Sequence, residues 1–194
     1  MQYPLELTFK LWALAPQISV VDPQGNLVFY VKQKLFKLKE AITIFADAER
    51  TRPLYYIKAD RIIDFSARYD FSDSNGASVG AVKRRGLKSL WRARYDIFDG
   101  DTTTLNIQEK NPWVKIADAL FAEIPILGIF TGYVFNPVYL VNRADGTVVM
   151  RLEKIPTFLS RKFIIKPVEQ ISDREEQQIL LSLIMMLLLE RNRG

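Results

Sequence analysis

The last stretch of the chain, residues 172–191, constrains the fold more than any other segment. It opens with Ser172-Asp173-Arg174-Glu175, which has the form of a capping box, so a helix is predicted over residues 173–191. From Ile179 to Leu189 its only polar residue is Ser182. A helix that is apolar on every side has to be buried on every side, so the rest of the chain is expected to enclose it.

A membrane anchor is the alternative interpretation of this segment. Eleven apolar residues at a rise of ~1.5 Å each cover only about half of a ~30 Å hydrocarbon core. Charged residues also close both ends of the stretch: Glu175 and Glu176 precede it, and Glu190, Arg191 and Arg193 follow it. A buried core helix is therefore favoured over a membrane span.

Short alternating segments upstream predict antiparallel strands. The apolar runs 18–21 and 27–31 flank a tight turn at residues 22–26. Asp47, Asp73 and Asp99 recur at a step of 26 residues, so that each repeat holds two short strands and two turns. Such a repeat is typical of an up-and-down meander of hairpins.

Alternation also predicts which side chains point inward. Residues 67, 69 and 71 and their repeat partners 93, 95 and 97 are apolar, and the residues between them, such as Arg68, Asp70, Arg94 and Asp96, are charged. Further strands are expected at 126–135, 138–142, 148–155 and 162–168, giving about a dozen. A barrel of about twelve strands is wide enough for a helix ~10 Å across, whereas eight strands close only around their own side chains.

One amphipathic helix is expected inside the meander, near residues 112–123. Asn111 can cap it, Pro112 suits its first position, and Pro125 ends it. The predicted fold is mainly β, with one domain spanning residues 1–194. It is a closed antiparallel barrel of about twelve strands around the C-terminal helix, with this additional helix.

Composition excludes most catalytic chemistry. The chain has no histidine and no cysteine, which removes the usual general base, the serine-triad partner, thiolate nucleophiles and the commonest zinc ligands. Residues 76–80 match G-x-S-x-G but lie between predicted strands, so a turn is favoured over a hydrolase elbow. We expect no enzymatic activity and no cofactor.

Two other motifs also favour structural roles. The acidic turns 70–76 and 96–101 lack the spacing of an EF-hand, so ordinary hairpin turns are favoured over a calcium site and no metal is expected. Gly128 and Gly132 form a G-x-x-x-G that we interpret as kinks in curved strands. The absence of cysteine and of a signal peptide leads us to expect a cytoplasmic protein.

Basic residues give the functional prediction. The net charge is +5, and Lys32, Lys58 and Arg84 share the 26-residue step. Equivalent strands lie two apart, so these charges are expected at ~10 Å intervals on one outer surface. The predicted sites for lipid headgroups are Lys32, Lys58, Arg68, Lys83, Arg84, Arg85, Lys88, Arg92 and Arg94. The alternative is a solvated exterior on which acids such as Asp60, Asp70 and Asp96 balance the cations.

Several of these segments carry a family resemblance. They are the repeated hairpins at residues 31–36 and 93–99, the stretches 132–137, 144–147 and 152–154, and the closing helix. The chain resembles the tubby-like barrel superfamily, in the branch that holds phospholipid scramblase-like and LURP-one-related proteins. The resemblance implies a twelve-stranded barrel around a buried C-terminal helix. It also implies phosphoinositide binding, lipid handling or plant defence as functional precedents.

The functional expectation is a non-enzymatic intracellular barrel domain that binds anionic, phosphoinositide-like headgroups. It would act peripherally at the inner membrane surface through its basic outer face, without a transmembrane span. The alternative is a structural or protein–protein interaction module of the same family with no lipid ligand. Nucleic-acid binding is disfavoured because the aromatic residues are expected to face inward. A carrier role is disfavoured because the helix fills the cavity.

Overall fold

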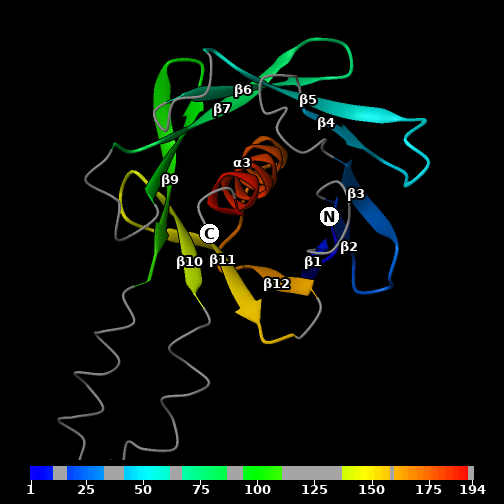
Figure 1. Cartoon of the computed structure of the whole chain (residues 1–194). Helices are drawn as coiled ribbons and strands as arrows, with labels where there is room; N and C mark the ends of the chain where they lie inside the picture. Colours follow the sequence, from blue (N-terminus) through cyan, green and yellow to red (C-terminus); the bar gives the residue numbers. More distant parts are fainter. Residues whose placement is uncertain are drawn as a thin grey trace, which may run out of the picture.

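The computed structural model describes residues 1–10, 17–32, 42–61, 67–86, 94–110, 137–157 and 160–191 (Figure 1). The strands are β1 Leu5–Lys10, β2 Gln17–Val21, β3 Leu27–Lys32, β4 Ile42–Phe45, β5 Pro53–Ala59, β6 Arg68–Asp73, β7 Ser78–Arg84, β8 Arg94–Asp99, β9 Thr102–Glu109, β10 Val138–Arg143, β11 Val148–Ile155 and β12 Ser160–Pro167. The helix α3 spans Asp173–Arg191.

The twelve strands form one closed barrel around α3. Each strand pairs antiparallel with the next, and β12 returns to pair with β1, so the sheet has no free edge. Figure 1 shows α3 in the middle of the ring of strands. The predicted barrel and its central C-terminal helix are confirmed. The helix predicted near residues 112–123 and the strand predicted at 126–135 lie outside the described residues.

The buried side chains follow the predicted alternation. Tyr69, Phe71, Tyr95 and Ile97 are at most 2 % exposed and point into the barrel. On α3 itself, every residue from Ile179 to Leu188 is buried. The predicted capping box is also present, because the Glu175 backbone N–H donates to Ser172 Oγ at 3.2 Å and the Ser172 N–H donates to Glu175 Oε2 at 3.0 Å.

A β-bulge recurs at the same place in five successive hairpins. The pairing register shifts next to the turn in β2–β3, β4–β5, β6–β7, β8–β9 and β10–β11. The extra residues include Val28 and Leu54, which pack against the core, and Val79 and Val149, which are buried within it. Because a bulge bends its strand and increases the twist, this repetition curves the sheet over one end of α3.

Polar contacts fix the direction of α3 in the barrel. At its N-terminal end Arg174 donates to the Asp99 carboxylate at 2.7 and 2.8 Å, and Arg143 Nε donates to Glu175 at 2.9 Å. At its C-terminal end the Tyr95 hydroxyl donates to Glu190 at 2.5 Å. The N-terminus of α3 therefore lies at the end of the barrel that holds the bulged hairpins, which we call the turn end. Its C-terminus lies at the opposite end, where the odd-numbered strands finish, which we call the connector end.

The Asp99–Arg174 pair predicts acid sensitivity. The hydrogen bonds from Arg174 lower the pKa of Asp99, so the ionised carboxylate stabilises the fold above the ordinary aspartate pKa of ~3.9, and that contribution is lost as the pH falls below it. We expect Asp99→Asn to lower the free energy of unfolding at pH 7 and to have much less effect at pH 3. Urea denaturation at both pH values measures this. Glu49→Gln, an exposed turn-end change, is the control; equal losses at both pH values for Asp99→Asn would contradict the prediction.

Candidate anion-binding end of the barrel

Every odd-numbered strand has a basic residue at its last position or one residue to either side of it. In an up-and-down barrel the odd strands all run the same way, so these side chains meet at the connector end. The even strands that begin there add Arg94, the first residue of β8, and Arg161, the second of β12. The strand-end cations are Lys10, Lys32, Lys58, Arg84, Lys154 and, directly after β9, Lys110.

We call this set, with the addition of Lys83 and Arg85 and without Arg84, the basic rim. Its members are Lys10, Lys32, Lys58, Lys83, Arg85, Arg94, Lys110, Lys154 and Arg161. Lys10, Lys32 and Lys58 are exposed, and their side chains make no hydrogen bond or ion pair with any other residue that the structure describes. The C-terminus of α3, the negative end of its dipole, lies at the same end, which favours cations there.

The turn end carries acidic residues, and the hydrogen bonding of the hairpin turns accounts for them. Asp22, Asp47 and Asp73 each accept two backbone N–H groups of their own hairpin at 2.8–2.9 Å, and Asp145 accepts that of Thr147 at 2.8 Å. These hydrogen bonds hold the pKa of the Asp47 and Asp145 carboxyls below the ordinary range. The turn acids thus stabilise their own hairpins. Lys10, Lys32 and Lys58 make no such contact with the described residues, which makes the connector end the better candidate for a binding site.

The position of Arg84 differs from the predicted cationic face. It was expected outside with Lys32 and Lys58, but its side chain is only 5 % exposed and points into the barrel. The reason is the turn length. The β6–β7 hairpin leaves residues 73–77 between its last paired residues, whereas β4–β5 leaves residues 46–52. The outward position equivalent to Lys58 is therefore Lys83, one residue earlier.

Inside the barrel, Arg84 belongs to a cluster that holds the C-terminal end of α3. Its guanidinium lies 5.9 Å from the centre of the Tyr95 ring, and its NH1 lies 3.8 Å from Glu190 Oε1. The Tyr95 hydroxyl binds the same carboxylate oxygen. Arg84 thus positions the helix and is not available to a ligand.

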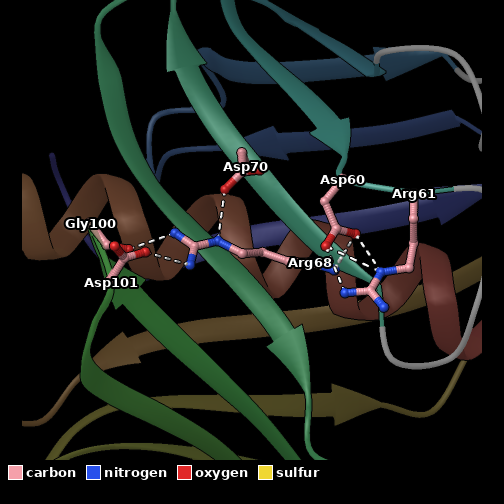
Figure 2. Close-up of polar contacts among 6 residues, drawn as sticks. All are labelled: Asp60, Arg61, Arg68, Asp70, Gly100 and Asp101. Atoms are coloured by element: carbon pink, nitrogen blue, oxygen red, sulfur yellow. Dashed lines mark hydrogen bonds and ion pairs between the residues drawn. The ribbon is translucent and has the colours of Figure 1, made fainter.

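Arg68 is also unavailable, although it lies outside. Figure 2 shows its guanidinium directed at Asp70, Gly100 and Asp101. The distances are 2.8 Å to Asp70 Oδ1, 2.5 Å to the Gly100 carbonyl and 3.3 Å to Asp101 Oδ1. The guanidinium carbon also lies 5.0 Å from the centre of the Phe98 ring. The side chain crosses β7 to join β6 to the β8–β9 turn, so its charge is used within the fold.

The other predicted residues divide into two groups. Lys32, Lys58, Lys83, Arg85 and Arg94 lie on the basic rim, where Arg85 Nε contacts Asp96 at 3.0 Å and remains 63 % exposed on its side chain. Lys88 and Arg92 lie outside the described residues. Acids also lie among these cations. The structure therefore arranges the cations as a ring at one end of the barrel, whereas the prediction placed them on one continuous face of its side.

Sequence reasoning missed four rim residues, Lys10, Lys110, Lys154 and Arg161. Their common feature is position, because each lies within two residues of a strand end in the structure. Recognising it required the strand directions. Together with Tyr139, Leu187 and Glu190, Lys154 and Arg161 line a hollow of about 100 Å³ in the mouth of the barrel. Burial raises the pKa of the Tyr139 hydroxyl, which keeps it protonated.

The described residues show no membrane-spanning helix and no metal site. Over the ranges given above, no helix combines the length and the apolar character that a span requires. Within the same ranges, no three His, Cys, Asp or Glu side chains gather as metal ligands would.

Fold and site together define a closed β-barrel domain with a helical core and one basic end. The family model described as LURP-one-related matches residues 27–124, just over half of the sequence, and the chain belongs to this family, with its tubby-like barrel fold. Among solved structures, the chain is similar to an Arabidopsis thaliana protein determined by X-ray crystallography. That likeness has 15 % sequence identity and a TM-score of 0.48, and it covers 98 % of this chain and 92 % of the other. No curated protein matches the sequence.

Proposed function

We propose that this chain is a non-enzymatic domain that docks on anionic phospholipid surfaces through its basic rim. The observation that carries the proposal is the cation at or next to the end of each odd-numbered strand, in a barrel whose turn-end acids are engaged by turns and helix contacts. Because α3 fills the interior, a ligand is expected to act on the outside of the barrel.

The geometry suits a flat anionic surface. Lys32, Lys58 and Lys83 lie on β3, β5 and β7, each two strands from the next, which spaces them about 10 Å apart. A cation near an anionic membrane contributes about 1 kcal/mol, so three of them change the binding constant by about a hundredfold. A ring of charges can contact several headgroups at once without a deep pocket.

Sequence composition supports a membrane over a purely polyanionic partner. In the sequence, residues 11–16, 87–93 and 111–136 separate β1 from β2, β7 from β8 and β9 from β10, and they are outside the described part of the chain. They contain all three tryptophans, Trp12, Trp91 and Trp113. Tryptophan is enriched where proteins meet the membrane–water interface.

Vesicle co-sedimentation tests the proposal. We expect the protein to pellet with vesicles containing phosphatidylserine and not with pure phosphatidylcholine. Changing Lys10, Lys32 and Lys58 together to Glu is expected to weaken this binding at least a hundredfold, because attraction becomes repulsion. The matched control changes Arg50, Arg52 and Lys166 to Glu. It alters the net charge equally, but its residues lie at or near the turn end.

The two variants separate position from net charge. If both lose binding equally, only overall charge matters and the rim has no special role. If the wild-type protein pellets equally with neutral and anionic vesicles, or with neither, the lipid proposal is wrong and the interaction-module alternative gains support. Thermal melting of each variant confirms that it remains folded.

A further inference from the structure

A polar groove of about 280 Å³ lies across β8, β9 and β10 on the outer wall of the barrel. One end is lined by Arg85, Arg94 and Asp96, and the other by the β10–β11 turn at Ala144 and Gly146. Between them lie three amide side chains, those of Asn106, Gln108 and Asn142. The volume is at the small end of the range for ligand pockets, and the lining is far more polar than that of a lipid-tail cavity.

Two arginines stand opposite each other at one end of the groove. The Arg85 backbone N–H donates to the Arg94 carbonyl at 2.9 Å, one position beyond the last rung of the β7–β8 ladder. Like charges at facing positions repel unless an anion lies between them. Asp96 contacts Arg85 through Nε, whereas the exposed Arg94 side chain makes no hydrogen bond or ion pair with any described residue. The guanidinium of Arg94 is therefore available to an oxyanion.

The floor of the groove offers amide donors and acceptors. Asn142 Nδ2 donates to Asn106 Oδ1 at 3.3 Å, and Asn142 as a whole is only 4 % exposed. Gln108 faces Arg94 directly across the β8–β9 ladder. An amide side chain carries two donors and a two-lone-pair acceptor, so these groups can bind hydroxyls that both give and accept hydrogen bonds. Arg143 adds no charge, because its guanidinium is directed at Glu175 and the Gln170 carbonyl.

We infer that this groove binds a small hydroxylated molecule that carries a phosphate monoester. The phosphate lies between Arg85 and Arg94, because the planar guanidinium fork matches phosphate oxygens bidentately. The hydroxyl groups lie along Asn106, Gln108 and Asn142. The groove shares Arg85 and Arg94 with the basic rim, but it continues along the wall and its amide floor is no part of the rim, so the inference goes beyond the proposed docking role.

Isothermal titration calorimetry on the full chain tests the inference with glucose 6-phosphate, glycerol 3-phosphate and glucose as probes. We expect at least one of the phosphate esters to bind with a dissociation constant at or below about 1 mM, and glucose to bind at least tenfold more weakly. Arg94→Gln is expected to weaken the ester at least tenfold, and Asn106→Asp, which brings a second carboxylate beside Asp96, is expected to do the same. Lys166→Gln is the matched control and is expected to change nothing.

Two further measurements distinguish the source of the phosphate and separate this inference from the docking proposal. Phosphatidic acid vesicles present the glycerol 3-phosphate group on a lipid. If these vesicles compete with soluble glycerol 3-phosphate, the groove is a headgroup site. If only the soluble ester binds, it is a metabolite site. The Lys10, Lys32, Lys58 triple variant is expected to keep its affinity for the soluble ester even where it loses vesicles. No saturable binding of either ester, or unchanged affinity in Arg94→Gln, would overturn the inference whatever the vesicles show.

Discussion

Replacing Leu183 with Asp is expected to abolish cooperative folding. Leu183 is 0 % exposed, at the middle of a helix enclosed on every side by the barrel. An ionised carboxylate placed there loses its hydration and gains no partner, and the lost Leu packing adds to that cost. The sum exceeds about 5 kcal/mol, which is comparable with the whole stability of a typical domain. Far-UV circular dichroism during urea titration is the measurement, and no sigmoidal transition is expected.

The neighbouring residue provides a matched control with the opposite sign. Ser182 is also 0 % exposed, and its hydroxyl has no hydrogen-bond partner among the residues described. Ser182→Ala removes an unsatisfied buried polar group at little cost in volume, so it is expected to leave stability unchanged or to raise it by about 1 kcal/mol. A Leu183→Asp protein that unfolds at the wild-type urea midpoint would show that α3 is not enclosed.

The central helix and the barrel were predictable because their signals are local. The capping box at Ser172 and Glu175 and the apolar run that follows specify a helix without reference to the rest of the chain. An all-round apolar surface then requires enclosure. The inward set around Tyr69 and Tyr95 follows from alternation alone, since successive strand side chains alternate between the two faces.

The site was less predictable because it depends on non-local geometry. The first paired residue after the turn is Pro53 on β5 and Ser78 on β7, a step of 25 residues and not 26. This shift by one residue places Arg84 inside the barrel, since any odd shift in register exchanges the two faces. Arg68 pairs with Asp101, 33 positions away in sequence, across an intervening strand. Neither effect is visible in the 26-residue repeat, which records the order of the hairpins but not the length of each turn.

The charge polarity of the barrel follows from the same chain geometry. Hairpin turns need side chains that accept their own backbone N–H groups, and aspartate does this well, so acids collect at the turn end. The odd strands carry Lys or Arg at their finishing ends, so cations collect at the other end. Net charge alone, +5, gives no hint of this separation. The prediction of one outer face carrying Lys32, Lys58 and Arg84 therefore holds for the position of the two lysines and is wrong for the position of Arg84.

Changing Gly80 to Ala is expected to destabilise the barrel by about 2–5 kcal/mol, because it combines backbone strain with a steric clash. Gly80 lies on β7 where the strand approaches α3, and its φ of +154° is rarely adopted by residues with a side chain. A Cβ there would lie 2.6 Å from the Phe98 carbonyl oxygen and 3.1 Å from the side chain of Gln178, whose Nε2 donates to the Val79 carbonyl at 2.9 Å. The carbonyl belongs to the β8 backbone and cannot move without disturbing its ladder.

Gly76→Ala separates the two contributions to this loss. Gly76 also has a positive φ, +85°, but a Cβ there would meet nothing within 4 Å, so only the backbone term of about 1 kcal/mol is expected. Urea midpoints of the two variants give the difference, which measures how closely the β8 backbone and the Gln178 side chain crowd Gly80. Equal losses at the two positions would contradict this close packing and would mean that β7 has room to move away from both.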